Sequence, residues 1–322
     1  MYYVIATVAI IALELLYFFL AKKFHIVDRP NERSSHHKVV LLGAGIIFYL
    51  AMLFYSLTNG IPYPNFLIGL SALAIISYID DLRQLPSWFR LFAQLFAVLF
   101  SFWFDINALE IWQIMLLVIV FAGILNIYNF MDGINGITSG YSLAVLAPLI
   151  VLNRSLHFID MSYLIVVGIA CLIFCFFNFR PKGKAKCFAG DVGSIGIAFM
   201  ILLPLGKLIL QTGDVTYIIL LAVYGVDTIL TICHRILLHE HLGQAHRKHA
   251  FQIMANELRL PHEVVSLSYM VIQTIISFGL LYISRYHWIY AVCAIGVLCI
   301  AYLLFMKKYY HLHAQYLHSL EK

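Results

Sequence analysis

The sequence has 322 residues, of which 62% are hydrophobic and 11% are charged, and its formal net charge is +5. Soluble domains carry about 25% charged residues, so this composition excludes an ordinary water-soluble protein. Apolar stretches recur along the chain, and each is close to the ~20 residues that a helix needs to cross a bilayer. The sequence therefore predicts an all-α polytopic membrane protein with a single transmembrane domain over residues 1–322.

Eleven apolar stretches are predicted to be membrane-spanning helices. In chain order they cover roughly residues 2–21, 39–58, 65–79, 90–104, 111–127, 137–152, 161–178, 193–210, 215–232, 264–283 and 287–306.

The positive charges between these spans are distributed unevenly. Of the 21 Lys and Arg residues, 18 fall in alternate loops and the C-terminal tail, whereas only Arg154 and Arg285 fall in the opposite loops. The remaining residue, Lys207, lies within a span. Because Lys and Arg favour the cytoplasmic side, this predicts an outside N-terminus and a cytoplasmic C-terminus. No basic run with interleaved aromatic residues occurs, so nucleic acid is not expected as a partner.

Polar residues that are unusual in a membrane protein cluster on the predicted cytosolic side, which indicates an active face. Asp80 and Asp81 are adjacent at the end of the third predicted span. Two neighbouring carboxylates repel each other, and a divalent cation with a preference for oxygen ligands, such as Mg²⁺ or Mn²⁺, would relieve the repulsion. A solvated helix end is the alternative interpretation.

A second polar cluster follows the fifth predicted span. Asn126, Asn129 and Asp132 are spaced by three residues, so on a helix they share one face. Gly133 and Gly136 allow a ligand or another backbone to approach closely. The stripe either meets a polar ligand or forms a hydrogen-bonded seam between helices.

A third candidate is Asp191, in a Gly-Asp-Val-Gly-Ser segment that follows a run of basic residues. A carboxylate between glycines beside a span suits a metal site, although the same residues also suit an ordinary turn.

The fourth candidate is residues 239–252, here called the histidine loop. It contains four His together with Arg247 and Lys248, but no Cys and no recognised zinc-binding spacing. Arg pairs with phosphate oxygens through two parallel hydrogen bonds, so phosphate binding fits the loop better than zinc binding. An ordinary basic loop is the alternative.

These four segments, in this order, resemble the polyprenyl-phosphate N-acetylhexosamine-1-phosphate transferases of glycosyltransferase family 4 type. That family combines an Asp-Asp pair, an Asn-x-x-Asn-x-x-Asp-Gly-x-x-Gly segment, a Gly-Asp-x-Gly-Ser segment and a late histidine-rich loop. The resemblance covers roughly residues 28–252. The span count and the end of the histidine loop are similar to those of the branch that initiates O-antigen, capsule and common-antigen synthesis.

The resemblance implies a multi-pass enzyme of the bacterial inner membrane. It would transfer N-acetylhexosamine-1-phosphate, or a deoxy relative, from a UDP-sugar to undecaprenyl phosphate and release UMP. This is the first membrane step of surface-glycan synthesis. Mg²⁺ would be the cofactor, with Mn²⁺ as a substitute. Membrane lipids are expected partners, and a homodimer is compatible with the sequence.

The resemblance also implies roles for individual residues. Asp80, Asp81, Asp132 and Asp191 would be catalytic, the last three as metal ligands and Asp80 as a base or an acceptor-orienting carboxylate. Direct displacement and a two-step route through a phosphorylated aspartate both remain open. Donor and acceptor would be held by Asn126, Asn129, Asp227, Arg235, His246, Arg247, His249, His36 and Lys38.

A transporter or a non-catalytic membrane scaffold is the alternative functional class. Against a transporter, the polar clusters lie at one predicted face rather than at the membrane midplane, and no inverted repeat is visible.

Overall fold

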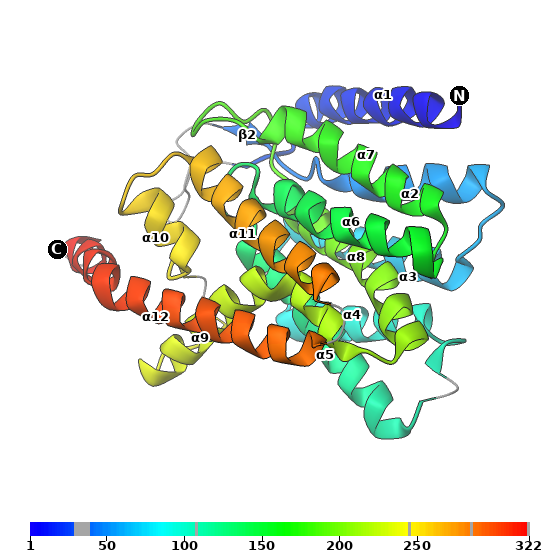
Figure 1. Ribbon diagram of the computed structural model, residues 1–322. Coiled ribbons are helices and arrows are strands. Elements are labelled where there is room, and N and C mark those ends of the chain that lie inside the picture. The colour runs from blue at the N-terminus through cyan, green and yellow to red at the C-terminus, as the bar shows by residue number, and fades with distance from the viewer. Residues whose placement is uncertain (29–38, 107–108, 244–245, 284–285, 321–322) are drawn as a thin grey trace.

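The computed structural model describes residues 1–28, 39–106, 109–243, 246–283 and 286–320, and it is built almost entirely of helices (Figure 1). The helices are α1 (Tyr2–Lys23), α2 (Ile46–Thr58), α3 (Pro64–Leu82), α4 (Ser87–Ser101), α5 (Ile111–Met131), α6 (Ile137–Leu156), α7 (Met161–Asn178), α8 (Gly190–Thr212), the 3₁₀ helix η2 (Val215–Leu221), α9 (Ala222–Leu237), α10 (Ala250–Asn256), α11 (His262–Tyr282) and α12 (His287–Leu320). This architecture confirms the prediction of an all-α polytopic membrane protein.

Each of the eleven predicted spans falls on a helical segment of its own. In the described ranges, nine segments are long and apolar enough to cross a membrane, and η2 with α9 forms one of them. The other two, α2 and α4, are apolar but have only 13 and 15 residues.

The prediction of helix from residue 39 is wrong for residues 39–45. Val40–Leu41 forms β2, which pairs antiparallel with β1 (Val27–Asp28). Gly43 follows with a φ of +72°, which no α-helix contains. The Tyr17 hydroxyl donates a hydrogen bond of 2.5 Å to the Leu42 carbonyl and holds this turn against α1. Helix α2 therefore begins only at Ile46.

Two features at the C-terminal end were not predicted. The last span was expected to end near residue 306, whereas α12 continues to Leu320. Residues 307–320 contain neither Pro nor Gly, so nothing in the sequence stops the helix. Helix α10, with seven residues, begins at Ala250 within the histidine loop and precedes α11.

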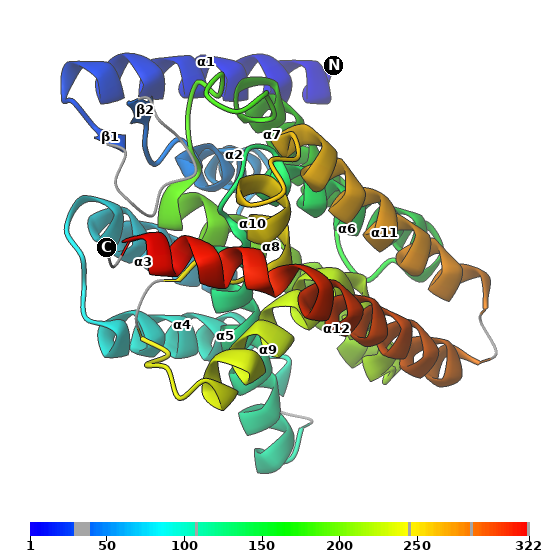
Figure 2. The ribbon, with the colours of Figure 1, turned by 90° about the vertical axis from the view of Figure 1, so that its left-hand side faces the viewer.

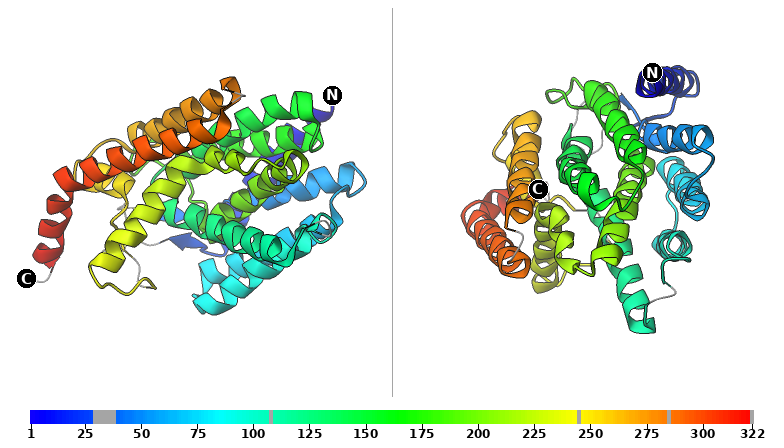
Figure 3. Two further views of the ribbon diagram at one scale, coloured as in Figure 1. Left: turned by 60° about the horizontal axis from the view of Figure 1, so that its bottom comes forward. Right: turned by 45° about the vertical axis from the view of Figure 1, so that its right-hand side comes forward.

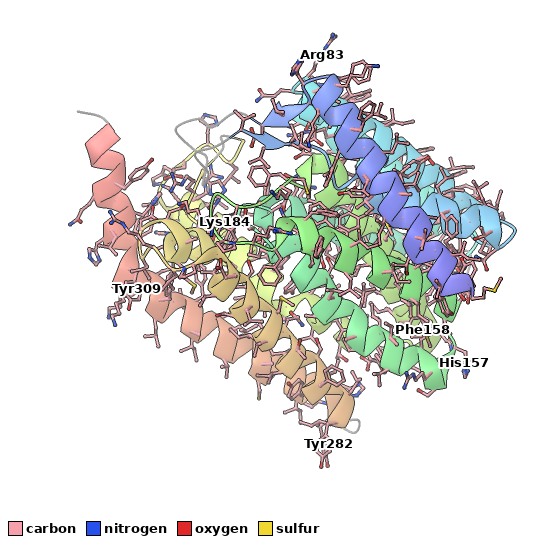
Figure 4. The ribbon with its side chains drawn as sticks, turned by 90° about the horizontal axis from the view of Figure 1, so that it is seen from above. Arg83, His157, Phe158, Lys184, Tyr282 and Tyr309 are labelled. Atoms are coloured by element: carbon pink, nitrogen blue, oxygen red, sulfur yellow. The ribbon has the colours of Figure 1, made fainter. Side chains whose placement is uncertain are left out.

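The bundle has two ends (Figure 4). Arg83, Lys184 and Tyr309 lie toward one end, and His157, Phe158 and Tyr282 lie toward the other. The charge asymmetry predicts that the end with Arg83 and Lys184 faces the cytosol.

Helix α8 is the core of the bundle, whereas α1 and α12 lie at its periphery (Figure 3, right). Small residues let α8 approach its neighbours closely. A Cβ on Gly45 would lie 2.2 Å from the Gly193 Cα, so the two backbones are in direct contact. The pair fixes the turn before α2 against the first turn of α8.

Candidate active site

Residues from separate segments line a cavity of about 280 Å³ at the Arg83–Lys184 end of the bundle. Its lining residues are Asp28, Leu42, Asp81, Asn129, Asp132, Gly133, Ile134, Asn135, Asn178, Phe188, Ala189, Gly190, Asp191, Ser194, Gln252 and His262. The three aspartates predicted as metal ligands are all among them.

Asp81 is held by the N-terminus of α8. Its carboxylate accepts hydrogen bonds from the backbone N–H groups of Asp191, at 2.7 Å, and Val192, at 3.1 Å. The first N–H groups of a helix lack partners within the helix, and its N-terminal end favours negative charge. Gly190 permits this contact, because it has a φ of +69° and a Cβ there would lie 2.5 Å from Asp81 Oδ2. A glycine is therefore required beside the carboxylate.

Asp132 caps the end of α5 and accepts a hydrogen bond of 2.5 Å from the Thr138 hydroxyl. Burial raises the pKa of Asp132 to about 6, although the Thr138 hydrogen bond acts in the opposite direction. A nearby cation would stabilise the charged form of this carboxyl.

Arg90 links Asp80 and Asp191, the other two aspartates predicted to be catalytic. Its Nη1 lies 2.7 Å from Asp80 Oδ2 and 3.4 Å from Asp191 Oδ2. Asp80 also accepts a hydrogen bond of 2.6 Å from the Leu85 N–H, and it does not line the cavity. Arg90 was not predicted as a site residue. Its position in the first turn of an apolar helix was the available signal, because such a charge is costly unless it is paired.

The predicted stripe of Asn126, Asn129 and Asp132 is divided between two cavities. Asn129 and Asp132 line the aspartate cavity, and Asn129 Nδ2 donates to Ser194 Oγ at 3.3 Å. Asn126 donates to Gln94 Oε1 at 2.7 Å and lines a neighbouring groove.

This groove has a volume of about 470 Å³ and runs between α5 and α9, with Ile295 of α12 also lining it. Apart from Asn126, Thr228 and two tyrosines, its lining residues are apolar. It reaches the surface of the bundle, because the lining residues Phe130, Ile229 and Ile295 are 41%, 55% and 40% exposed.

Asp227 and Arg235 lie behind the histidine loop and do not line the aspartate cavity. The buried Asp227 carboxylate accepts hydrogen bonds from the Tyr269 hydroxyl at 2.6 Å and from the Ala250 N–H at 3.1 Å, and lies 3.3 Å from His249 Nδ1. The buried Arg235 guanidinium donates to the backbone carbonyls of residues 241 and 242. Both residues hold the loop in place.

The remaining predicted loop residues also lie outside the cavity lining. The rings of His246 and His249 have centroids 5.0 Å apart, and Arg247 Nη1 donates to the Tyr316 hydroxyl at 3.3 Å. Burial, with His249 and Arg235 nearby, lowers the pKa of His246 to about 3, so this imidazole is neutral at physiological pH. His36 and Lys38 lie outside the described residues.

Several polar cavity residues were not predicted as site residues, among them Gln252 and His262. Gln252 belongs to α10, and His262 begins α11 directly after Pro261. His262 Nδ1 lies 3.3 Å from the Asn135 backbone N, while its Nε2 is buried and meets no hydrogen-bond partner among the described residues. A histidine directly after a proline at the start of an apolar helix was the only available signal.

The donor set of the cavity suits a hard divalent cation, since its charged groups are carboxylates. Within the described ranges, no three His, Cys, Asp or Glu residues are close enough together to hold a metal ion by themselves. Mg²⁺ does not need such a set, because proteins usually bind it through one or two carboxylates together with water and substrate phosphates. Asp81, Asp132 and Asp191 therefore fit a cation that arrives with a phosphate-bearing substrate.

The sequence is similar to known membrane transferases. The sequence model of glycosyl transferase family 4 matches residues 63–207. A probable undecaprenyl-phosphate N-acetylglucosaminyl 1-phosphate transferase of Bacillus subtilis (strain 168) is 28% identical over 252 residues, which cover 71% of this chain and 70% of the relative.

Two undecaprenyl-phosphate α-N-acetylglucosaminyl 1-phosphate transferases also match. The protein from Thermotoga maritima is 31% identical over 45% of this chain and 48% of its own length. The protein from Yersinia pestis is 26% identical over 58% and 60%, respectively. The chain is thus a multi-pass membrane protein whose sequence is similar to glycosyl transferase family 4 over residues 63–207 and to undecaprenyl-phosphate N-acetylglucosaminyl 1-phosphate transferases over 45–71% of its length.

Proposed function

We propose that this protein transfers N-acetylhexosamine-1-phosphate, or a deoxy relative, from a UDP-sugar to undecaprenyl phosphate. The proposal rests above all on the cavity that Asp81, Asp132 and Asp191 line together from three separate helices or helix ends. The printed names of the three relatives support the same acceptor and the same kind of reaction. The reaction would be the first membrane step of bacterial surface-glycan synthesis, at the cytosolic face of the inner membrane.

The groove between α5 and α9 is the proposed site of the polyprenyl chain. Its lining is apolar and reaches the surface of the bundle within segments that are long enough to lie in the bilayer. Asn126 lines the groove and Asn129 lines the aspartate cavity, and the two are three residues apart on α5. A lipid that lay in the groove could therefore extend its phosphate toward the aspartates.

In the proposed reaction, an oxygen of the acceptor phosphate attacks the β-phosphorus of the UDP-sugar. The bond from that phosphorus to the oxygen bridging the two phosphates breaks, and UMP leaves with the electron pair. Such phosphoryl transfers are accelerated mainly by positioning and by charge neutralisation. Mg²⁺ held by Asp191, with Asp81 and Asp132, would neutralise the pyrophosphate charge and stabilise the departing UMP.

The protein's own groups would position the substrates. The amides of Asn129 and Gln252 and the imidazole of His262 face the cavity and can hydrogen-bond to phosphate oxygens. Arg90 fixes the orientation of Asp80 and Asp191 through its two contacts. Asp80 is the proposed residue for orienting the acceptor phosphate or accepting its proton.

The test is a product assay on detergent-purified protein with undecaprenyl phosphate, Mg²⁺ and a panel of UDP-N-acetylhexosamines. The expected result is UMP release that depends on the lipid and on one donor. Reactions without the lipid measure background hydrolysis. Because no vesicle is present, turnover also excludes a transporter. Folded protein that releases no UMP from any donor, including 6-deoxy donors, would overturn the proposal.

A further inference from the structure

Helix α12 is longer than a membrane span requires. Its 34 residues correspond to about 51 Å at ~1.5 Å per residue, whereas a bilayer core is about 30 Å thick. The first part is apolar, and Lys307 and Lys308 mark where it ends. The red end of the helix projects beyond the neighbouring helices (Figure 3, left). We call residues 307–320 the α12 extension.

One face of α12 packs against the elements that carry the histidine loop (Figure 2). Tyr302, Met306, Tyr310 and His313 follow one another at helical spacing, so they share this face. Tyr302 and Met306 form a small hydrophobic cluster with residues of α9 and α10. On another face of the extension, His311 is exposed.

Three contacts of the extension reach the loop or its flanking helices. The Tyr310 ring lies edge-on to the His234 ring of α9, with centroids 4.5 Å apart. Tyr316 accepts the hydrogen bond from Arg247, whose guanidinium lies 5.1 Å from the centre of the Tyr316 ring.

A well-buried contact joins His313 to Glu257. His313 Nδ1 lies 2.8 Å from Glu257 Oε1, and the two side chains are 1% and 7% exposed. Glu257 is the residue that ends α10. Because a buried carboxylate is costly without a partner, this contact fixes the C-terminal end of α10 to α12.

The other end of α10 forms a wall of the aspartate cavity. Gln252 lines the cavity. The Phe251 ring packs closely on Gly133, because a Cβ added to Gly133 would lie 3.0 Å from the ring. Gly133 directly follows Asp132. A displacement of α10 would therefore change the cavity beside Asp132.

We propose that the α12 extension positions the histidine loop and α10 for donor binding, with His313 as the positioning residue. The α12 extension acts through Glu257 and α10. In the described part of the chain, the partners named above (His234, Arg247 and Glu257) do not line the aspartate cavity. This inference rests on the proposed function, because the donor is the ligand whose binding should respond. Its effect should be specific to the UDP-sugar, since among the described residues α12 contributes only Ile295 to the lining of the acceptor groove, and Ile295 lies before the α12 extension.

The test compares His313→Ala, His313→Asn and the exposed control His311→Ala in the UMP-release assay. The Asn side-chain amide occupies the position of Nδ1 and can still donate to Glu257. His313→Ala should raise the donor KM about tenfold and leave the acceptor KM unchanged, because misplaced binding groups have costs of this order. His313→Asn should restore most of the donor affinity, and His311→Ala should behave like the wild type.

Hydrogen exchange of the α10 amides provides a readout that does not need activity. Exchange should become faster in His313→Ala than in either other variant, while the α11 amides keep the wild-type rate. An unchanged donor KM, an equal rise in both KM values, or unchanged exchange in α10 would overturn the positioning role. A wild-type protein that releases no UMP would instead overturn the proposed function. The exchange rates would then test only whether His313 holds α10 in place.

Discussion

Two groups of carboxylates lie near the same end of the bundle, and only one of them lines the aspartate cavity. Asp227 accepts hydrogen bonds from a tyrosine hydroxyl and a backbone N–H and lies beside an imidazole. Asp81 and Asp132 also accept hydrogen bonds, but these two carboxylates and Asp191 line one cavity. A fully buried carboxylate with several donors stabilises the fold, whereas carboxylates gathered at a cavity fit a cation and a substrate. The comparison separates the aspartate that holds the histidine loop from those proposed to act in the reaction.

Removal of divalent cations should have the largest effect. A chelator should abolish UMP release, and added Mg²⁺ should restore it, because the cavity carboxylates would otherwise repel the donor phosphates. Thermal unfolding with and without the chelator serves as a control for loss of the fold. Activity that persists without divalent cations would overturn the proposed role of all three aspartates.

Asp191→Asn should have the second-largest effect on activity. We expect a loss of about hundredfold or more in kcat at an unchanged unfolding temperature. The amide keeps the size of the side chain but removes its charge. Retention of more than about a tenth of the activity, which corresponds to ~1.4 kcal/mol of barrier, would exclude Asp191 as the main ligand.

Arg247→Ala should have a smaller effect, mainly on donor use. If the guanidinium leaves Tyr316 to pair with the donor phosphates, the donor KM should rise about tenfold, the cost of one lost charge-assisted contact. The matched control is Arg259→Ala, which removes a neighbouring exposed charge. Identical KM and kcat in Arg247→Ala and the wild type would make this part of the loop purely structural.

Asp227→Asn should have the smallest effect on kcat and the clearest effect on stability. It weakens hydrogen bonds to a buried carboxylate, so the free energy of unfolding should fall by about 1–3 kcal/mol. The comparison of thermal unfolding with kcat checks this expectation. A loss of kcat as large as that of Asp191→Asn, with normal stability, would assign Asp227 to the chemistry. Asp227 would then no longer differ in role from the cavity aspartates.

The helices could be predicted because a membrane imposes a length and an apolar composition on every span. The structure departs from the predicted helices only in short segments. The turn at Gly43 depends on a contact with Tyr17, and α10 is too short for a periodic signal. The α12 extension is polar enough to resemble a loose tail, yet it stays helical where it packs on α9 and α10.

The candidate site was predictable where a residue's type was unusual for its position. Asp81, Asp132 and Asp191 are charged residues at the ends of apolar helices, and the structure brings them to one cavity. Arg90 and His262 were missed because their relevance depends on which distant segments meet. The partners of Asp227 were equally invisible, since four of them come from the histidine loop, α10 and α11.

The contact between Gly45 and Gly193 restricts how the protein could be redesigned. Each glycine occupies the space that a side chain on the other would need, so any larger residue at either position must push the two backbones apart. That separation would displace the first turn of α8, whose N–H groups hold Asp81. Attempts to alter the aspartate cavity can therefore change the side chains that line it, but this junction has to be kept as a pair.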